Sequence, residues 1–118
     1  MKKAPLGKHY LIDFYECDRA LINDIEKIRL LMLKTAALIP TKVVNQVFHP
    51  FSPYGISGVI VISESHFAIH TWPEHGLVSI DLFTCNPKMN IDRALTFLKE
   101  SLGANRIKTH TVDRGDEL

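Results

Sequence analysis

The sequence predicts an α+β fold, a two-layer α/β sandwich with a mainly antiparallel sheet and two helices on one face. Six segments have the alternation or composition of β-strands, and two have the apolar spacing of helices. The expected order is β-α-β-β-β-β-α-β, with short connections between consecutive strands. A chain of 118 residues is expected to form a single domain, here 1–118.

The first part of the chain predicts a strand, a helix and a second strand. Every second side chain of residues 9–15 is apolar, which indicates a strand. We expect Asp18 to cap a helix that runs to about residue 38 and stops before Pro40. Residues 41–48 are rich in valine and predict the next strand. The apolar stripe of the helix consists of Leu21, Ile22, Ile25, Ile28 and Met32.

The second part predicts a turn, three strands, a helix and a last strand. Residues 50–55 contain two prolines and a glycine, which indicate a turn or loop. Asn90 is placed to cap the second helix, and Gly103 is placed to end it. A last strand is expected at 106–112. The three strands expected after the turn are 56–63, 66–72 and 77–84.

Two of these strands, 56–63 and 77–84, are too apolar for one of their faces to remain in water. The two helices can cover only one face of the sheet. The sequence therefore predicts a homodimer that stacks sheet on sheet, giving an αββα arrangement.

The charge balance excludes several classes of partner. Fourteen basic and thirteen acidic residues leave a net charge of +1, which gives no reason to expect a nucleic acid or an anionic membrane as partner. No apolar run is long enough for a membrane span, and the N-terminus leads into no signal-peptide core. In such a chain Cys17 and Cys85 are expected to be free thiols, so we expect a cytoplasmic protein.

Chemically active side chains are concentrated at 62–66, at 70–74 and at Cys85, between apolar strand segments. Taken singly, each of these residues would be interpreted as a tolerated core or surface residue. Polar groups inside core-forming strands cost free energy unless they are paired or used, and here they are dense.

The sequence disfavours two kinds of site, a zinc site and the active site of a serine hydrolase. His66, His70, His75 and Cys85 are residue types that bind zinc, but His66 and His70 lie about 13 Å apart on a strand. We therefore expect no metal. A serine hydrolase would need a nucleophile elbow of the Gly-x-Ser-x-Gly type, and that motif is absent from the sequence.

A third kind of chemistry is internal attack by a serine on its own peptide bond. The hydroxyl of Ser65 would attack the preceding carbonyl, and elimination and hydrolysis of the resulting ester would leave a pyruvoyl group. This reaction needs an oxyanion donor and a base, for which Ser57 and His70 are candidates. A pyruvoyl carbonyl then serves as an electron sink through a Schiff base to an amine substrate.

The chain resembles the prokaryotic, short-form S-adenosylmethionine decarboxylases, pyruvoyl enzymes of polyamine biosynthesis. The resemblance extends over nearly the whole chain and follows the family order. The matching segments are FYECD at 14–18, FHPF at 48–51, PYGISG at 53–58, ISESH at 62–66, HTWPE at 70–74 and DLFTC at 81–85.

The resemblance implies a self-cleaving proenzyme that decarboxylates S-adenosylmethionine to the aminopropyl donor for spermidine. Cleavage between Glu64 and Ser65 would give a β chain, 1–64, and an α chain, 65–118, that begins with the pyruvoyl group. Ser57 and His70 match the processing residues, and Cys85 matches the proton donor. The residues that match substrate-binding positions are Phe51 and Trp72, near the nucleoside and sulfonium, and Glu74, at the ribose.

The alternation of the strands adds two expectations about this site. Cys85 should share a face with Asp81 and Phe83, and His66 and His70 should share a face that Ser65 does not. A turn or bulge is therefore expected at Glu64–Ser65, where it would also supply strain. Two alternatives stay open: a pyruvoyl enzyme acting on arginine or ornithine, and an unprocessed regulatory paralogue.

Overall fold

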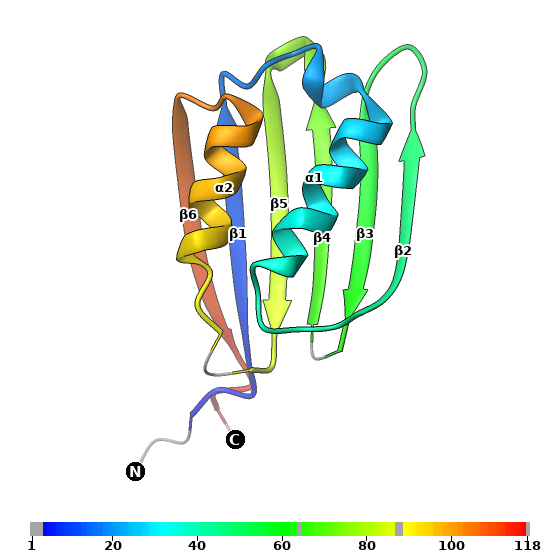
Figure 1. Cartoon of the computed structure of the whole chain (residues 1–118). Helices are drawn as coiled ribbons and strands as arrows, with labels where there is room; N and C mark the ends of the chain where they lie inside the picture. The colour runs from blue at the N-terminus through cyan, green and yellow to red at the C-terminus, as the bar shows by residue number, and fades with distance from the viewer. Residues whose placement is uncertain (1–3, 64, 87–88, 118) are drawn as a thin grey trace.

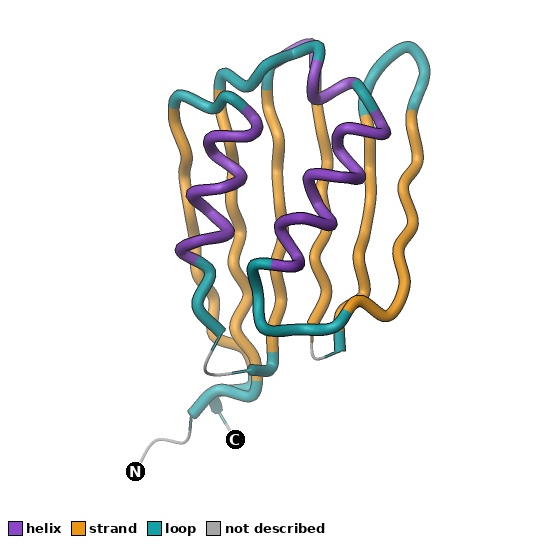
Figure 2. Tube along the Cα trace, in the orientation of Figure 1, coloured by secondary structure: helices purple, strands orange, loops and turns teal. Residues whose placement is uncertain are grey.

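A computed structural model describes residues 4–63, 65–86 and 89–117. They form a six-stranded antiparallel sheet with both α-helices side by side on one face (Figures 1 and 2). The strands are β1 (Gly7–Tyr15), β2 (Val43–Pro50), β3 (Ile56–Ile62), β4 (Ser65–Trp72), β5 (Leu77–Thr84) and β6 (Arg106–Arg114). The helices are α1 (Ile25–Ala37) and α2 (Asp92–Leu102), and two 3₁₀ turns, η1 (Leu21–Asn23) and η2 (Pro73–His75), precede α1 and β5.

The strand order in the sheet is β2-β3-β4-β5-β1-β6. Strands β2 to β5 form consecutive hairpins, whereas β1 lies between β5 and β6. The chain crosses the same face twice, through α1 to reach the edge strand β2 and through α2 to reach the other edge strand β6 (Figure 1). The prediction of an α+β fold with an antiparallel sheet and two helices on one face is therefore confirmed.

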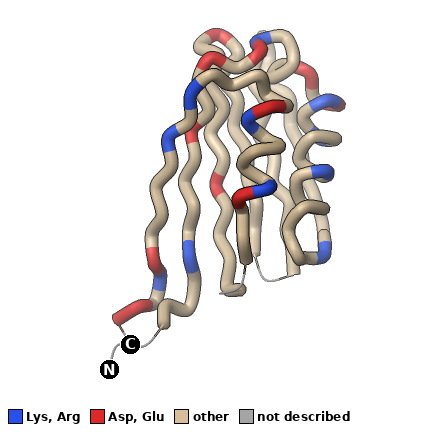
Figure 3. Tube along the Cα trace, turned by 60° about the vertical axis from the view of Figure 1, so that its left-hand side comes forward, with Lys and Arg blue, Asp and Glu red and all other residues tan. Residues whose placement is uncertain are grey.

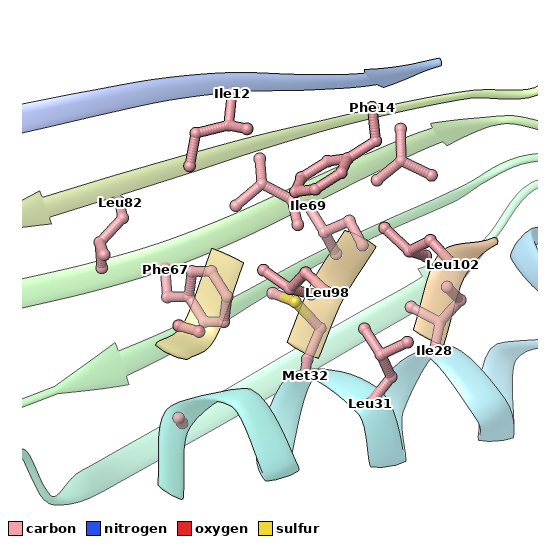
Figure 4. Close-up of a cluster of buried hydrophobic side chains, with 14 of the residues drawn as sticks. Ile12, Phe14, Ile28, Leu31, Met32, Phe67, Ile69, Leu82, Leu98 and Leu102 are labelled. Carbon is pink, nitrogen blue, oxygen red and sulfur yellow. The ribbon is translucent and has the colours of Figure 1, made fainter. Parts of the chain in front are cut away.

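The core lies between the sheet and the helices (Figure 4). Phe67 and Ile69 of β4 and Phe14 of β1 point from the sheet toward Met32 of α1 and Leu98 of α2, and all five are at most 1% exposed. Burial of each such side chain stabilises the fold by about 1.5–3 kcal/mol. Neither α-helix in the described part of the chain has the length and apolar character needed to cross a membrane.

The first helix begins later than the sequence predicts. Asp18 does not cap it: the Asp18 carboxylate accepts hydrogen bonds from the N–H groups of Ala20 and Leu21 in a turn. The true cap is Asp24, whose Oδ1 accepts the N–H of Lys27 at 3.1 Å. Leu21 and Ile22 continue the apolar spacing of the helix although they belong to the 3₁₀ turn, which explains the error.

Smaller differences concern the ends of other elements. Asn90 lies one residue before the cap position of α2, where its Oδ1 accepts the N–H of Asp92. Gly103 ends α2 with a φ of +67°, as expected. Strand β4 begins at Ser65 rather than at residue 66, and β6 extends to Arg114.

The second face of the sheet, here called the open face, carries the alternate side chains of the strands. One row across it, read from the strand register, is His49, Ser57, His70, Ser79, Asp13 and Lys108. Large apolar side chains are exposed beside this row, with Val47, Val61 and Val112 at 62%, 44% and 43%. Acidic and basic residues are interspersed over the helices, loops and outer strands (Figure 3).

Candidate active site

Ser57 and His70 form a hydrogen-bonded pair on the open face. They lie directly opposite one another on β3 and β4, and Ser57 Oγ is 2.9 Å from His70 Nδ1. The strand register alone creates this contact, because the two residues are 13 positions apart in the sequence. A serine hydroxyl that is hydrogen-bonded to an imidazole can exchange a proton with it, so the pair is suited to general acid–base catalysis.

Ser65 is the first residue of β4, opposite Ile62 on β3 and Thr84 on β5. Its Oγ is buried and has no hydrogen-bond partner among the described residues. A buried hydroxyl without a partner is uncommon, and such groups often have a chemical role. Ser65 is therefore a candidate for a chemical role, as the sequence predicts.

The chain reverses direction immediately before Ser65. Strand β3 ends at Ile62, Ser63 lies in a turn, and Ile62 pairs with Ser65. The turn or bulge expected at Glu64–Ser65 stays a prediction, since the structure describes a turn at Ser63 and strand at Ser65 but not the residue between them. Glu64 lies outside the described residues, so the predicted cleavage bond and the predicted strain stay predictions.

Ser65 and His70 do not meet within one chain. Ser65 alternates with the buried Phe67 and Ile69 on the helix side of β4, whereas His66 and His70 lie on the open face, as expected. Five residue steps along the strand also separate Ser65 from His70 by about 16 Å. One copy of the chain thus contains the proposed nucleophile and the proposed base, but holds them apart.

Cys85 lies at the same end of the sheet as Ser65. It follows Thr84, which pairs with Ser65, and its thiol is free and exposed. Because β5 ends at Thr84, strand alternation does not determine the face on which Cys85 lies. Cys85, Thr84 and the segment 4–8 line a cavity of about 190 Å³. We call this end, with Ser65 and Cys85, the Ser65 half-site.

Phe51, Trp72 and Glu74 lie at the opposite end of the sheet, in or beside the loops that leave β2 and β4. Phe51 and Trp72 are 52% and 40% exposed, and Glu74 is exposed on η2. The Trp72 ring is 6.3 Å from the ring of His70. We call this end, with Ser57, His70, Phe51, Trp72 and Glu74, the His70 half-site.

Two open-face groups were not anticipated. Ser79 donates a hydrogen bond of 2.6 Å to Asp13, beside His70 in the polar row. His9 and His66 lie on either side of Phe83, and the Phe83 and His66 rings stack at 5.6 Å. The Ser79–Asp13 and His9–Phe83 contacts depend on β1 lying beside β5, which the sequence pattern alone does not reveal, whereas the His66–Phe83 stack lies within the β4–β5 hairpin. Among the described residues no group of three or more His, Cys, Asp or Glu could hold a metal ion.

Comparison with known proteins relates this chain to one family. Residues 8–115 match the family model of S-adenosylmethionine decarboxylase. A relative from Thermosipho africanus, named S-adenosylmethionine decarboxylase proenzyme, is 46% identical over 115 residues, which cover 96% of this chain and 88% of the relative. A relative of the same name from Thermotoga maritima is 44% identical with the same coverage.

A solved structure is similar as well. The crystal structure of the adenosylmethionine decarboxylase from Aquifex aeolicus matches with a TM-score of 0.86 at 33% identity, over 96% of this chain and 93% of that chain. The match to the family model and the similarity of sequence and fold lead to one conclusion. The chain belongs to the S-adenosylmethionine decarboxylase family.

Proposed function

We propose that this chain is a proenzyme that cuts itself between Glu64 and Ser65 and then decarboxylates S-adenosylmethionine. Membership of the family supports the reaction, and the product would be the aminopropyl donor for spermidine. The observation that carries the assignment of residues is the 2.9 Å contact between Ser57 Oγ and His70 Nδ1. A second observation is the Ser65 hydroxyl, which has no hydrogen-bond partner among the described residues and lies at the other end of β4.

In the cleavage, Ser65 Oγ attacks the carbonyl carbon of Glu64 and the peptide C–N bond breaks, which leaves an ester. His70 removes the α-proton of Ser65, so that the ester C–O bond breaks by elimination. Hydrolysis of the remaining enamine releases ammonia and leaves a pyruvoyl group at position 65. The hydroxyl of Ser57 is placed to donate to the developing oxyanion. The products are a β chain, 1–64, and an α chain, 65–118.

Two copies of the chain are needed for this chemistry, because about 16 Å of strand separates Ser65 from His70 within one copy. An antiparallel stack of two open faces would place the His70 half-site of one copy against the end of the sheet that carries Ser65 in the other, although the Ser65 side chain points to the helix side of β4 in the uncut chain. Six strands of about eight residues give a face of about 760 Å², close to the roughly 800 Å² per partner of a stable interface. The exposed valines on this face support such a homodimer.

We propose that the pyruvoyl group arises from Ser65, whose buried hydroxyl has no hydrogen-bond partner among the described residues. We propose no metal cofactor. A pyruvoyl group supplies an electron sink for the loss of CO₂ from an amino acid. Cys85 then donates a proton to the substrate α-carbon. The exposed thiol at the end of β5 suits this role, because it adjoins the residue that pairs with Ser65.

The His70 half-site fits the nucleoside end of the substrate. A sulfonium cation has no hydrogen to donate, so the faces of Phe51 and Trp72 are suitable partners, worth about 0.5–2 kcal/mol each. The carboxylate of Glu74 can accept both ribose hydroxyls. These three exposed groups favour S-adenosylmethionine over arginine or ornithine as the substrate. The expected cytoplasmic location stays a prediction.

The test is release of CO₂ from S-adenosylmethionine, arginine and ornithine, measured with the natural chain and with Ser65→Ala. We expect release from S-adenosylmethionine alone, and none from the variant, which should remain one uncut chain. Release from arginine or ornithine would give the chain a different substrate. An uncut and inactive natural chain would make it a regulatory paralogue.

A further inference from the structure

The loop at residues 51–55, between β2 and β3, carries two exposed aromatic side chains at the end of the sheet that holds the His70 half-site. Phe51 and Tyr54 are 52% and 51% exposed. The N–H of Phe51 donates to the carbonyl of Gly55 at 2.7 Å, which closes the loop on itself. This bond fixes the shape of the loop but does not attach it to the rest of the molecule.

Asn23 attaches the loop to the helical layer. Its Oδ1 accepts the N–H of Gly55 at 3.0 Å, across 32 positions of sequence. Gly55 is buried and has a φ of +106°, a conformation that glycine adopts far more readily than other residues. A buried N–H is costly without an acceptor, so the amide of Asn23 stabilises this loop conformation.

Asn23 itself is held by its neighbours. The carboxylate of Asp18 accepts two N–H groups at the start of the same segment, the side chain of Ile22 is fully buried, and Asp24 caps α1. These contacts fix the backbone that carries Asn23, although its side chain lies at the surface.

On its other side the loop is attached to β4. Thr71 is 5% exposed, and its Oγ1 accepts the N–H of Ile56 at 2.9 Å. A Cβ atom at Gly55 would lie 3.3 Å from the carbonyl oxygen of Thr71. Thr71 immediately precedes Trp72, so the loop is fixed beside the tryptophan. Asn23, Tyr54 and Glu74 line one open groove of about 740 Å³.

We infer that Asn23 is a positioning residue for substrate binding: by holding Gly55 it keeps the loop at 51–55 beside Trp72 and Glu74. This inference rests on the proposed function, because it takes Phe51, Trp72 and Glu74 as the nucleoside contacts. Asn23 is neither a proposed nucleoside contact nor a proposed catalytic residue and acts only through the loop, so its effect is on affinity and not on the chemical step.

The experiment compares Asn23→Ala with Asn23→Asp, which retains an acceptor oxygen, and with Asn105→Ala, a control at an exposed asparagine before β6. For Asn23→Ala we expect KM for S-adenosylmethionine to rise about tenfold, equivalent to about 1.4 kcal/mol. We expect kcat to change by less than about twofold, and self-cleavage to proceed as in the natural chain. Asn23→Asp should restore most of the affinity, and Asn105→Ala should leave both constants unchanged.

A second readout does not depend on activity. Trp72 is the single tryptophan of the chain, so its quenching by acrylamide reports on the loop beside it. We expect stronger quenching in Asn23→Ala than in Asn23→Asp or the natural chain. Unchanged KM and quenching in Asn23→Ala would overturn the inference, as would an Asn23→Asp chain as impaired as the alanine variant. If the natural chain does not act on S-adenosylmethionine, the proposed function fails, and quenching alone then decides whether Asn23 holds the loop.

Discussion

The two cysteines show how burial separates residues of one type. The thiol of Cys17 is 6% exposed and donates to the carbonyl of Phe14, whereas Cys85 is exposed. Burial raises the pKa of Cys17 from 9.0 to about 11, and a hydrogen bond from the Val78 backbone opposes this only in part. Cys17 therefore keeps its proton at neutral pH and belongs to the core. The prediction of two free thiols is confirmed.

This shift makes stability depend on pH in the alkaline range. Between about pH 9 and pH 11 the unfolded chain loses the Cys17 proton while the folded chain keeps it, so the free energy of unfolding should fall as pH rises. The expected loss is about 2 kcal/mol. Urea unfolding at pH 8 and pH 10.5 measures it. Cys17→Ala should flatten the dependence and Cys85→Ala should not; an equally steep decline in Cys17→Ala would refute the assignment.

Cys85→Ala separates self-cleavage from turnover. Because Cys85 is proposed to donate a proton only after CO₂ has left, the variant should still cut itself but lose about 10²–10⁴-fold in kcat. Mass spectrometry reports the cut, and steady-state kinetics report the turnover. Cys17→Ala is the matched control and should retain nearly full turnover. A Cys85→Ala enzyme with the kcat of the natural chain would remove Cys85 from the mechanism.

At the scale of single residues, the sequence identified the candidate site residues but not the contacts between them. The chemical types at 57, 65, 70 and 85 and the family motifs around them indicated pyruvoyl chemistry, and the family match confirms the decarboxylase prediction. The pairing of Ser57 with His70 needs the β3–β4 register, and that of Asp13 with Ser79 needs the strand order. Neither is encoded in local spacing.

At the scale of elements, strands were easier to predict than the start of the first helix. Alternation and the prolines and glycines of the loops placed all six strands within a few residues. The start of α1 was wrong because Asp18 and Asp24 are both good caps, and the 3₁₀ turn between them keeps helical apolar spacing. The choice depends on where Ile22 packs, which is a tertiary contact.

Replacement of the true cap should cost stability. Asp24→Ala leaves the Lys27 N–H without its acceptor and should lower the free energy of unfolding by about 1 kcal/mol. Asp113→Ala, at an exposed aspartate of β6, is the control and should change it by less than about 0.5 kcal/mol. Urea titration of both variants measures the difference. Equal effects of the two substitutions would mean that the cap contributes nothing.

At the scale of the whole molecule, the sheet keeps the reactive groups of one chain apart. Strand β4 begins with Ser65 and ends with Trp72, so its two ends carry different halves of the proposed site. The surplus apolar strand surface predicted a second copy, and the exposed valines of the open face agree with that prediction without testing it. The order of the strands, with β1 between β5 and β6, could not be predicted, because the helical crossovers that set it leave no periodic signal.

The most direct test of this account is complementation between two inactive chains. Ser65→Ala and His70→Ala are produced separately and together, and each sample is analysed by denaturing mass spectrometry, in which the two chains differ in mass. Alone, each variant should remain a whole chain. Together, mixed dimers should contain one complete site, so only the His70→Ala chain should be cut, into pieces of 64 and 54 residues. If the His70→Ala chain cuts itself alone, or stays whole in dimers shown to contain both chains, the two-copy site proposed here is wrong.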